Sequence, residues 1–192
     1  RVWDEIVDEF KYSDFLFVAF GQKGKNVLTT ENLALMWDLS EAFELIPQMD
    51  EVLSIATTNR MDSNDGFLEV DDLMPNRELS TLEIEYLSEY LKYNSNLSSR
   101  LLGKNGDYVN IILRPQMGAD FPAMVTAMKK ITAPFENAYD FHFGGQPYIT
   151  GKVPGLILTE TQKLMLMGLL IMSVILLVNL RSLPSVGMIL LV

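Results

Sequence analysis

The feature that most limits how this chain can fold is an uncharged apolar run near its end. Residues 164–180 read LMLMGLLIMSVILLVNL, which is 17 residues without an acidic or basic side chain. As a helix the run spans roughly 25 Å, and extending it back to Thr159 gives roughly 33 Å. A bilayer's hydrocarbon core is about 30 Å thick, so we predict a transmembrane helix over residues 158–181. The alternative is a buried core helix of a soluble protein, which is disfavoured because the run is apolar on all sides.

Charge separates this run from the rest of the chain. The 192 residues include 25 acidic and 15 basic side chains, a net charge of −10. Residues 159–192 contribute +1 to this total, which leaves −11 for the first 158 residues. An acidic surface argues against a nucleic-acid partner, since phosphate binding needs clustered Lys and Arg. We therefore predict an acidic soluble domain over residues 13–157, held at a lipid bilayer by the apolar helix.

Both ends of the chain suggest a fragment of a longer protein. Residues 1–12 are amphipathic and predict a short lead-in helix from a missing first transmembrane helix. Residues 182–192 predict a turn and the truncated start of a further transmembrane helix. Arg181 in that turn favours a cytoplasmic position for it, which places the acidic domain on the extracytoplasmic side.

The acidic domain carries alternating strand and helix patterns. Strands are predicted by runs rich in Phe, Val, Ile and Thr at 14–21, 52–58, 108–114 and 141–149. Helices are predicted by capping residues and apolar faces at 30–46, 80–102 and 120–137, with a polar loop or hairpin at 59–75. Without the middle helix the order is β-α-β twice, and right-handed crossovers then place two helices on one face of a four-stranded sheet. We predict an α+β, ferredoxin-like domain with an extra helix.

Few residues in the sequence suggest catalysis or metal binding. The absence of cysteine excludes a disulfide framework, cysteine-ligated zinc and a thiol nucleophile. His142 is the single histidine, and no second catalytic partner is suggested near it. The acidic stretch from Asp62 departs from a calcium loop because Leu73 stands at its twelfth position, so we interpret it as solvated. Gly144 and Gly145 lack a phosphate-loop pattern and indicate a bend or a close backbone approach. We predict no catalytic, metal or cofactor site, and no enzyme.

Two sets of side chains at helical spacing could line a path for an apolar substrate. They are Tyr86 with Tyr90 in the middle helix, and Met124 with Met128 in the last helix of the domain. Methionine and tyrosine suit such a path because they adapt to irregular apolar ligands. Ordinary core packing is the favoured alternative for residues at this spacing.

Several segments, taken in order, resemble one family of membrane proteins. They are SDFLFVAFG, TTENL, IPQMDEVLSIATT, YVNIILR, GGQPYI, TETQK and NLRSLPS. Their order and spacing resemble the first extracytoplasmic loop and second transmembrane helix of RND-superfamily exporters. The closest resemblance is to the MMPL-like, hydrophobe/amphiphile efflux-3 type, and it covers nearly the whole chain.

The resemblance implies a proton-driven exporter of lipids or other hydrophobic or amphiphilic molecules. It implies a multi-pass protein of the cell (inner) membrane, with a periplasmic porter domain built from ferredoxin-like subdomains. Its partners would be the substrate, a second porter half of the same protein and, in a homo-oligomer, further copies. The proton-relay residues would lie in a later helix, outside this chain. A membrane-tethered binding or sensing module without transport activity is the alternative, and an extracytoplasmic enzyme is the weakest hypothesis because no nucleophile or metal motif is present.

Overall fold

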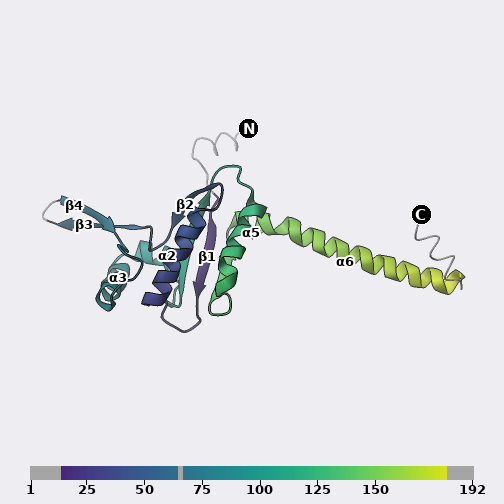
Figure 1. Ribbon diagram of the computed structural model, residues 1–192, viewed down its shortest axis with the longest axis horizontal. Coiled ribbons are helices and arrows are strands. Elements are labelled where there is room, and N and C mark those ends of the chain that lie inside the picture. Colours follow the sequence, from purple (N-terminus) through teal and green to yellow (C-terminus); the bar gives the residue numbers. More distant parts are fainter. Residues whose placement is uncertain (1–13, 65–66, 181–192) are drawn as a thin grey trace. The chain divides into compact units, whose positions relative to one another are not determined.

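The computed structural model describes residues 14–64 and 67–180, and it divides the chain into two compact units. The first unit is Arg1–Gly151, a mixed α+β domain, and the second is Lys152–Val192, which contains most of a long helix (Figure 1). The predicted lead-in helix over residues 1–12 and the predicted turn over residues 182–192 lie outside the described residues.

A four-stranded antiparallel sheet organises the first unit. Its strands are β1 (Leu16–Gly21), β2 (Met49–Leu53), β5 (Tyr108–Pro115) and β6 (Asp140–Gly144). They are arranged in the order β2-β5-β1-β6, so that β1 and β5 are the central strands. In the middle of the sheet, Val18 lies opposite Ile111 on one side and Phe143 on the other. The predicted α+β class with a four-stranded sheet is confirmed.

The core lies between one face of this sheet and two helices, α2 (Thr30–Glu44) and α5 (Phe121–Thr132). Side chains alternate across a strand, so one face of β1 is buried while the other is not. Leu16 and Val18 are fully buried, whereas Phe17 is 42% exposed. The helices contribute their apolar stripes to the same cluster, which includes Leu33, Met36, Leu39, Phe43, Met124, Val125 and Met128.

Short polar residues fix the helix starts as the sequence indicates. Thr29 caps α2, its hydroxyl accepting a hydrogen bond from the Asn32 amide. Ser80 and Glu83 form the predicted capping box at the start of α3 (Thr81–Tyr93). These side chains satisfy amide groups that have no partner inside the helix. At its other end α5 runs into a short 3₁₀ turn, η1 (Ala133–Phe135).

The predictions for the middle of the domain were wrong in extent at two places. The helix expected over 80–102 divides into α3 and α4 (Ser95–Leu101), because Asn94 leaves helical geometry and its side-chain amide donates a hydrogen bond to the Tyr90 carbonyl at 2.9 Å. The strand expected over 52–58 ends at Leu53, because the Thr57 hydroxyl donates a hydrogen bond to the Val52 carbonyl at 2.7 Å. Serine and threonine side chains compete with strand pairing in this way. The loop or hairpin expected over 59–75 is a hairpin of β3 (Asn59–Asn64) and β4 (Phe67–Asp72).

The largest correction concerns the end of the domain. The strand expected over 141–149 ends at Gly144, and the helix expected from residue 158 begins at Gln146 as α6 (Gln146–Leu180). Gly145 makes the change of direction with a φ of +101°, and a Cβ there would lie 2.0 Å from the Phe15 carbonyl oxygen. The predicted close backbone approach is therefore confirmed at Gly145. Pro147 then fits the first turn of a helix, where its missing amide hydrogen is not needed.

These contacts predict that two neighbouring glycines differ sharply in their tolerance of a methyl group. Gly145→Ala should lower the free energy of unfolding of the first unit by at least about 2 kcal/mol, through backbone strain and the clash with Phe15. Gly144→Ala is the matched control, because its nearest new neighbour is the Phe17 Cβ at 3.9 Å. Urea unfolding in detergent, followed by tryptophan fluorescence, measures both. Equal effects would contradict the steric account of Gly145.

Candidate functional site

Helix α6 is the described element with the clearest physical specialisation. Among the described residues it is the one helix long and apolar enough to cross a membrane. The candidate span is Gln146–Val178, 33 residues, with a mean hydropathy of 2.0 over its most apolar window. None of that window is buried. The Ser173 hydroxyl donates to the Leu169 carbonyl at 2.7 Å, and Lys163 pairs with Glu160 at 2.8 Å, so these three polar side chains find partners within the helix. A helix with these properties could span a bilayer.

The two methionines predicted for a substrate path lie inside the domain. Met124 is 2% exposed and Met128 is fully buried. Both project from α5 into the core that α5 shares with α2 and the sheet. In this arrangement the methionines stabilise the fold, and their contact with substrate stays a prediction.

The two tyrosines predicted for the path lie elsewhere, beside the β3–β4 hairpin. Tyr90 is partly buried, and its hydroxyl accepts a hydrogen bond from the Met61 amide at 3.3 Å. Tyr86 is about half exposed, and the Arg60 guanidinium lies over its ring at 5.3 Å from the centroid. Arg60 also pairs across the hairpin with Asp71 at 2.9 Å. The structure thus brings the tyrosines together as supports of the hairpin on α3.

A surface groove runs beside these tyrosines, and we name it the hairpin groove. Its volume is about 550 Å³. It is lined by Arg60, Asp71, Asp72, Leu73, Pro75, Leu79, Leu82, Glu83 and Tyr86. Leu73 and Leu79 form a buried floor, whereas Leu82 is largely exposed. The groove therefore combines an apolar surface with carboxylates from β4 and from the first turn of α3.

A second groove of about 570 Å³ lies along α2, and we name it the helix groove. Its lining residues are Thr30, Glu31, Ala34, Leu35, Asp38, Arg77, Glu78, Phe135 and Tyr139. Partial burial, and then the nearby charge of Glu31, raise the pKa of Tyr139. Its hydroxyl is therefore protonated at neutral pH and available as a donor. No local sequence pattern indicates this groove, because its lining residues come from three separate stretches of the chain, 30–38, 77–78 and 135–139.

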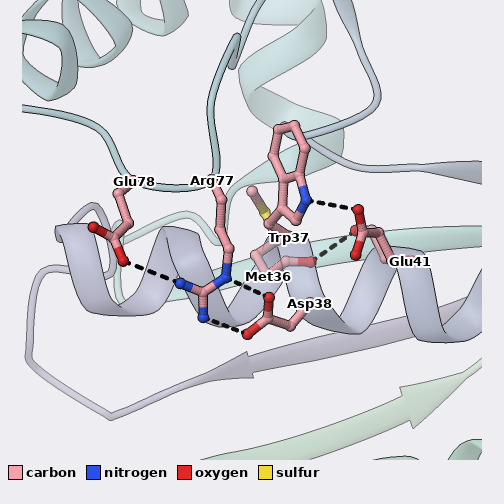
Figure 2. Close-up of polar contacts among 7 residues, drawn as sticks. Met36, Trp37, Asp38, Glu41, Arg77 and Glu78 are labelled. Atoms are coloured by element: carbon pink, nitrogen blue, oxygen red, sulfur yellow. Dashed lines mark hydrogen bonds and ion pairs between the residues drawn. The ribbon is translucent and has the colours of Figure 1, made fainter.

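Two residues that line the helix groove, Asp38 and Arg77, form an ion pair, which is drawn in Figure 2. The Arg77 guanidinium contacts both carboxylate oxygens of Asp38, at 2.6 and 2.7 Å, and also reaches Glu78 at 3.2 Å. Hydrogen bonds from Arg77, and then its positive charge, hold the pKa of Asp38 below its usual range. The Thr30 hydroxyl donates to the Leu79 carbonyl at 3.2 Å. The segment after the hairpin therefore contacts α2 at two places, at Thr30 and at Asp38. The contact with Asp38 is bidentate, a geometry that the planar guanidinium of arginine provides.

The remaining candidate residues carry no assembled chemistry. His142 is an exposed residue of β6, as predicted, and its ring packs edge-on against Tyr108 at 5.3 Å. Within residues 14–64 and 67–180, no group of three or more acidic, histidine or cysteine side chains could hold a metal ion. Of the predicted acidic stretch, Asp71 is engaged with Arg60. The helix groove and the hairpin groove are therefore considered as surfaces for binding a ligand.

Comparison with known proteins adds no assignment to this picture. No model of a known protein family matches the chain, and no curated protein matches it. The resemblance to RND exporters therefore depends on the sequence segments alone. Its consequences for function stay proposals.

The Asp38–Arg77 pair predicts a pH-dependent contribution to stability. Because the pKa of Asp38 is lowered by folding, its contribution is complete above about pH 5 and is lost as the pH falls below about 4. Asp38→Asn should lower the urea midpoint slightly at pH 7, since both side chains are half exposed and solvent screens them. The difference from wild type should shrink as the pH falls below about 4. Glu44→Gln, on the exposed side of the same helix, is the charge-matched control, and a pH-independent loss would refute the ion-pair account.

The burial of Met128 predicts a large effect on stability at that position. Met128→Ala should lower the free energy of unfolding by about 2–4 kcal/mol, because it leaves a cavity between α5 and the sheet. Met117 is 69% exposed, so Met117→Ala makes the same chemical change without a cavity and should have little effect. Urea unfolding in detergent measures both variants. A Met128→Ala protein as stable as Met117→Ala would show that the core is not packed as described.

Proposed function

We propose that the chain is the first porter domain and the following transmembrane helix of a proton-driven RND-superfamily exporter of the MMPL-like type. The exporter moves lipids or other hydrophobic or amphiphilic molecules outward. The observation that carries the proposal is a helix that follows an acidic α+β domain in the chain and whose most apolar window is not buried. An exposed apolar surface of this length indicates lipid contact.

The architecture of the domain supports the proposal independently of the helix. The sheet order β2-β5-β1-β6, with α2 and α5 on one face, is the arrangement expected of a ferredoxin-like subdomain. In this interpretation the hairpin, α3 and α4 form an insertion between the second and third strands of the sheet. The acidic domain would then be periplasmic, in a multi-pass protein of the inner membrane.

A porter domain must move as a body, and the packing of the first unit suits that requirement. The sheet and its two helices share one continuous core, which resists internal deformation. The opposite sheet face presents Phe15 and Phe17, each more than 40% exposed. We propose that this face meets the second porter half and that the two halves rock against each other in alternating access.

Transport by the full-length protein tests the driving force. In proteoliposomes with an imposed proton gradient, the purified exporter should move a fluorescent lipid across the membrane. A protonophore should reduce the rate to that of protein-free liposomes, because no other energy source is supplied. Lipid movement is followed by quenching of the fluorophore on the outer leaflet.

Two other outcomes would count against the proposal. Transport that continues unchanged after the gradient is collapsed would show that protons do not drive it. Lipid binding without any gradient-dependent movement would favour the alternative, a membrane-tethered binding or sensing module. Sealed liposomes with the protein but without a gradient serve as the control for passive flipping.

A further inference from the structure

We propose that the hairpin groove binds a lipophilic organic cation, with the apolar body of the ligand on the leucines and Tyr86 and its positive charge beside Asp72 and Glu83. This deepens the proposed function by naming a substrate class and a site for it. The site lies wholly in the first unit.

Charge is concentrated around this groove. Residues 59–93 contain nine acidic and three basic side chains, so they carry −6 of the chain's net −10. The groove lining itself has Asp71, Asp72 and Glu83 against the single cation Arg60. Arg60 is balanced by Asp71 at 2.9 Å, and no basic side chain within the described ranges forms an ion pair with Asp72. An anionic ligand would be repelled by this lining, and a cation is attracted.

Apolar surface is concentrated at the same place. Two large apolar side chains from α3 are exposed here, Leu82 at 78% and Tyr86 at 48%. Leu82 and Tyr86 line the groove directly, above the buried Leu73 and Leu79. Exposed apolar side chains that cluster beside a hollow indicate a binding surface. A purely hydrophilic cation would leave this surface in water.

The groove already accommodates one organic cation, the side chain of Arg60. Its guanidinium lies over the Tyr86 ring and against the Asp71 carboxylate. The same combination of aromatic ring and carboxylate recognises free organic cations. Asp72, one residue further along β4, offers a second carboxylate to a ligand.

Glu83 is held ionised and in place for such a contact. Its carboxylate accepts hydrogen bonds from the Ser80 hydroxyl and amide at 2.6 and 2.7 Å. These bonds lower the pKa of Glu83, so its charge persists in mildly acidic conditions. The volume of about 550 Å³ falls within the range of pockets that hold drug-sized ligands.

Protection of an introduced thiol tests the site with a matched pair of probes. The chain has no cysteine, so Leu82→Cys gives a single reactive thiol in the groove. Tetraphenylphosphonium is a lipophilic cation, and tetraphenylborate is an anion of nearly the same shape. In phosphatidylcholine nanodiscs, the cation should slow alkylation of Leu82→Cys, whereas the anion should not. Met117→Cys, at an exposed position away from the groove, should be alkylated at the same rate with either probe.

Substitutions in the lining then test the chemistry of recognition. On the Leu82→Cys background, Asp72→Asn and Tyr86→Leu should each raise the tetraphenylphosphonium concentration needed for half protection by about two- to fivefold. Glu44→Gln removes one negative charge outside the groove and should leave that concentration unchanged. Circular dichroism confirms that each variant remains folded.

Three results would overturn the proposal. They are an absence of protection by the cation, equal protection by the anion, and a half-protection concentration unchanged by both Asp72→Asn and Tyr86→Leu. Protection by a basic amphipathic peptide but not by the small cation would assign the surface to a protein partner instead. The assay requires no proton gradient, so its failure leaves the transport test of the proposed function intact.

Discussion

The exposed apolar surface of α6 is the constraint on which the rest of the interpretation depends. Apart from Leu176, its large apolar side chains between Leu164 and Val178 are 42–72% exposed, and contact with water alone would not stabilise such a surface. The charges that precede the apolar stretch, Glu160 and Lys163, form an ion pair at 2.8 Å. Contact with lipid acyl chains would remove these apolar side chains from water without any protein partner. The acidic domain must then fold without help from α6 beyond its first turns, which is consistent with a core that draws on the sheet, α2 and α5.

The second constraint is how the insertion between β2 and β5 is held. An isolated two-stranded hairpin is marginally stable in water. Here it is supported by Tyr86 and Tyr90 from α3, while the returning segment buries Met74 and Leu79 in the core and is tied to α2 by Arg77. These anchors are mostly at the base of the insertion. They leave the acidic and apolar outer surface, with the hairpin groove, available to a ligand.

The sequence predicted those parts of the fold that local patterns determine. Runs rich in Phe, Val and Ile identified β1 and β5, capping residues located the starts of α2 and α3, and the uncharged run located the apolar part of α6. The errors arose where a side chain or a distant backbone group decided the outcome. The Thr57 hydroxyl bonds to the Val52 carbonyl and ends β2. Gly145 changes the direction of the chain where it approaches the Phe15 backbone, about 130 residues away, and no local pattern contains that contact. For the same reason Tyr86 could be named as a candidate, whereas Arg60, whose guanidinium lies over the Tyr86 ring only in the fold, could not.

The distribution of charge in α6 bears on how energy would reach the porter domain. Among its described residues the charged side chains are Lys152, Glu160 and Lys163, and Glu160 is already paired with Lys163. No acidic residue lies in the stretch that follows, so this part of the helix has no group with which to carry a proton through the membrane. In a proton-driven exporter α6 would therefore act mechanically, by transmitting movement from helices that do carry protons. Pro154 interrupts the hydrogen-bond ladder of α6 close to where the two units divide, and a helix bends most readily at such a position.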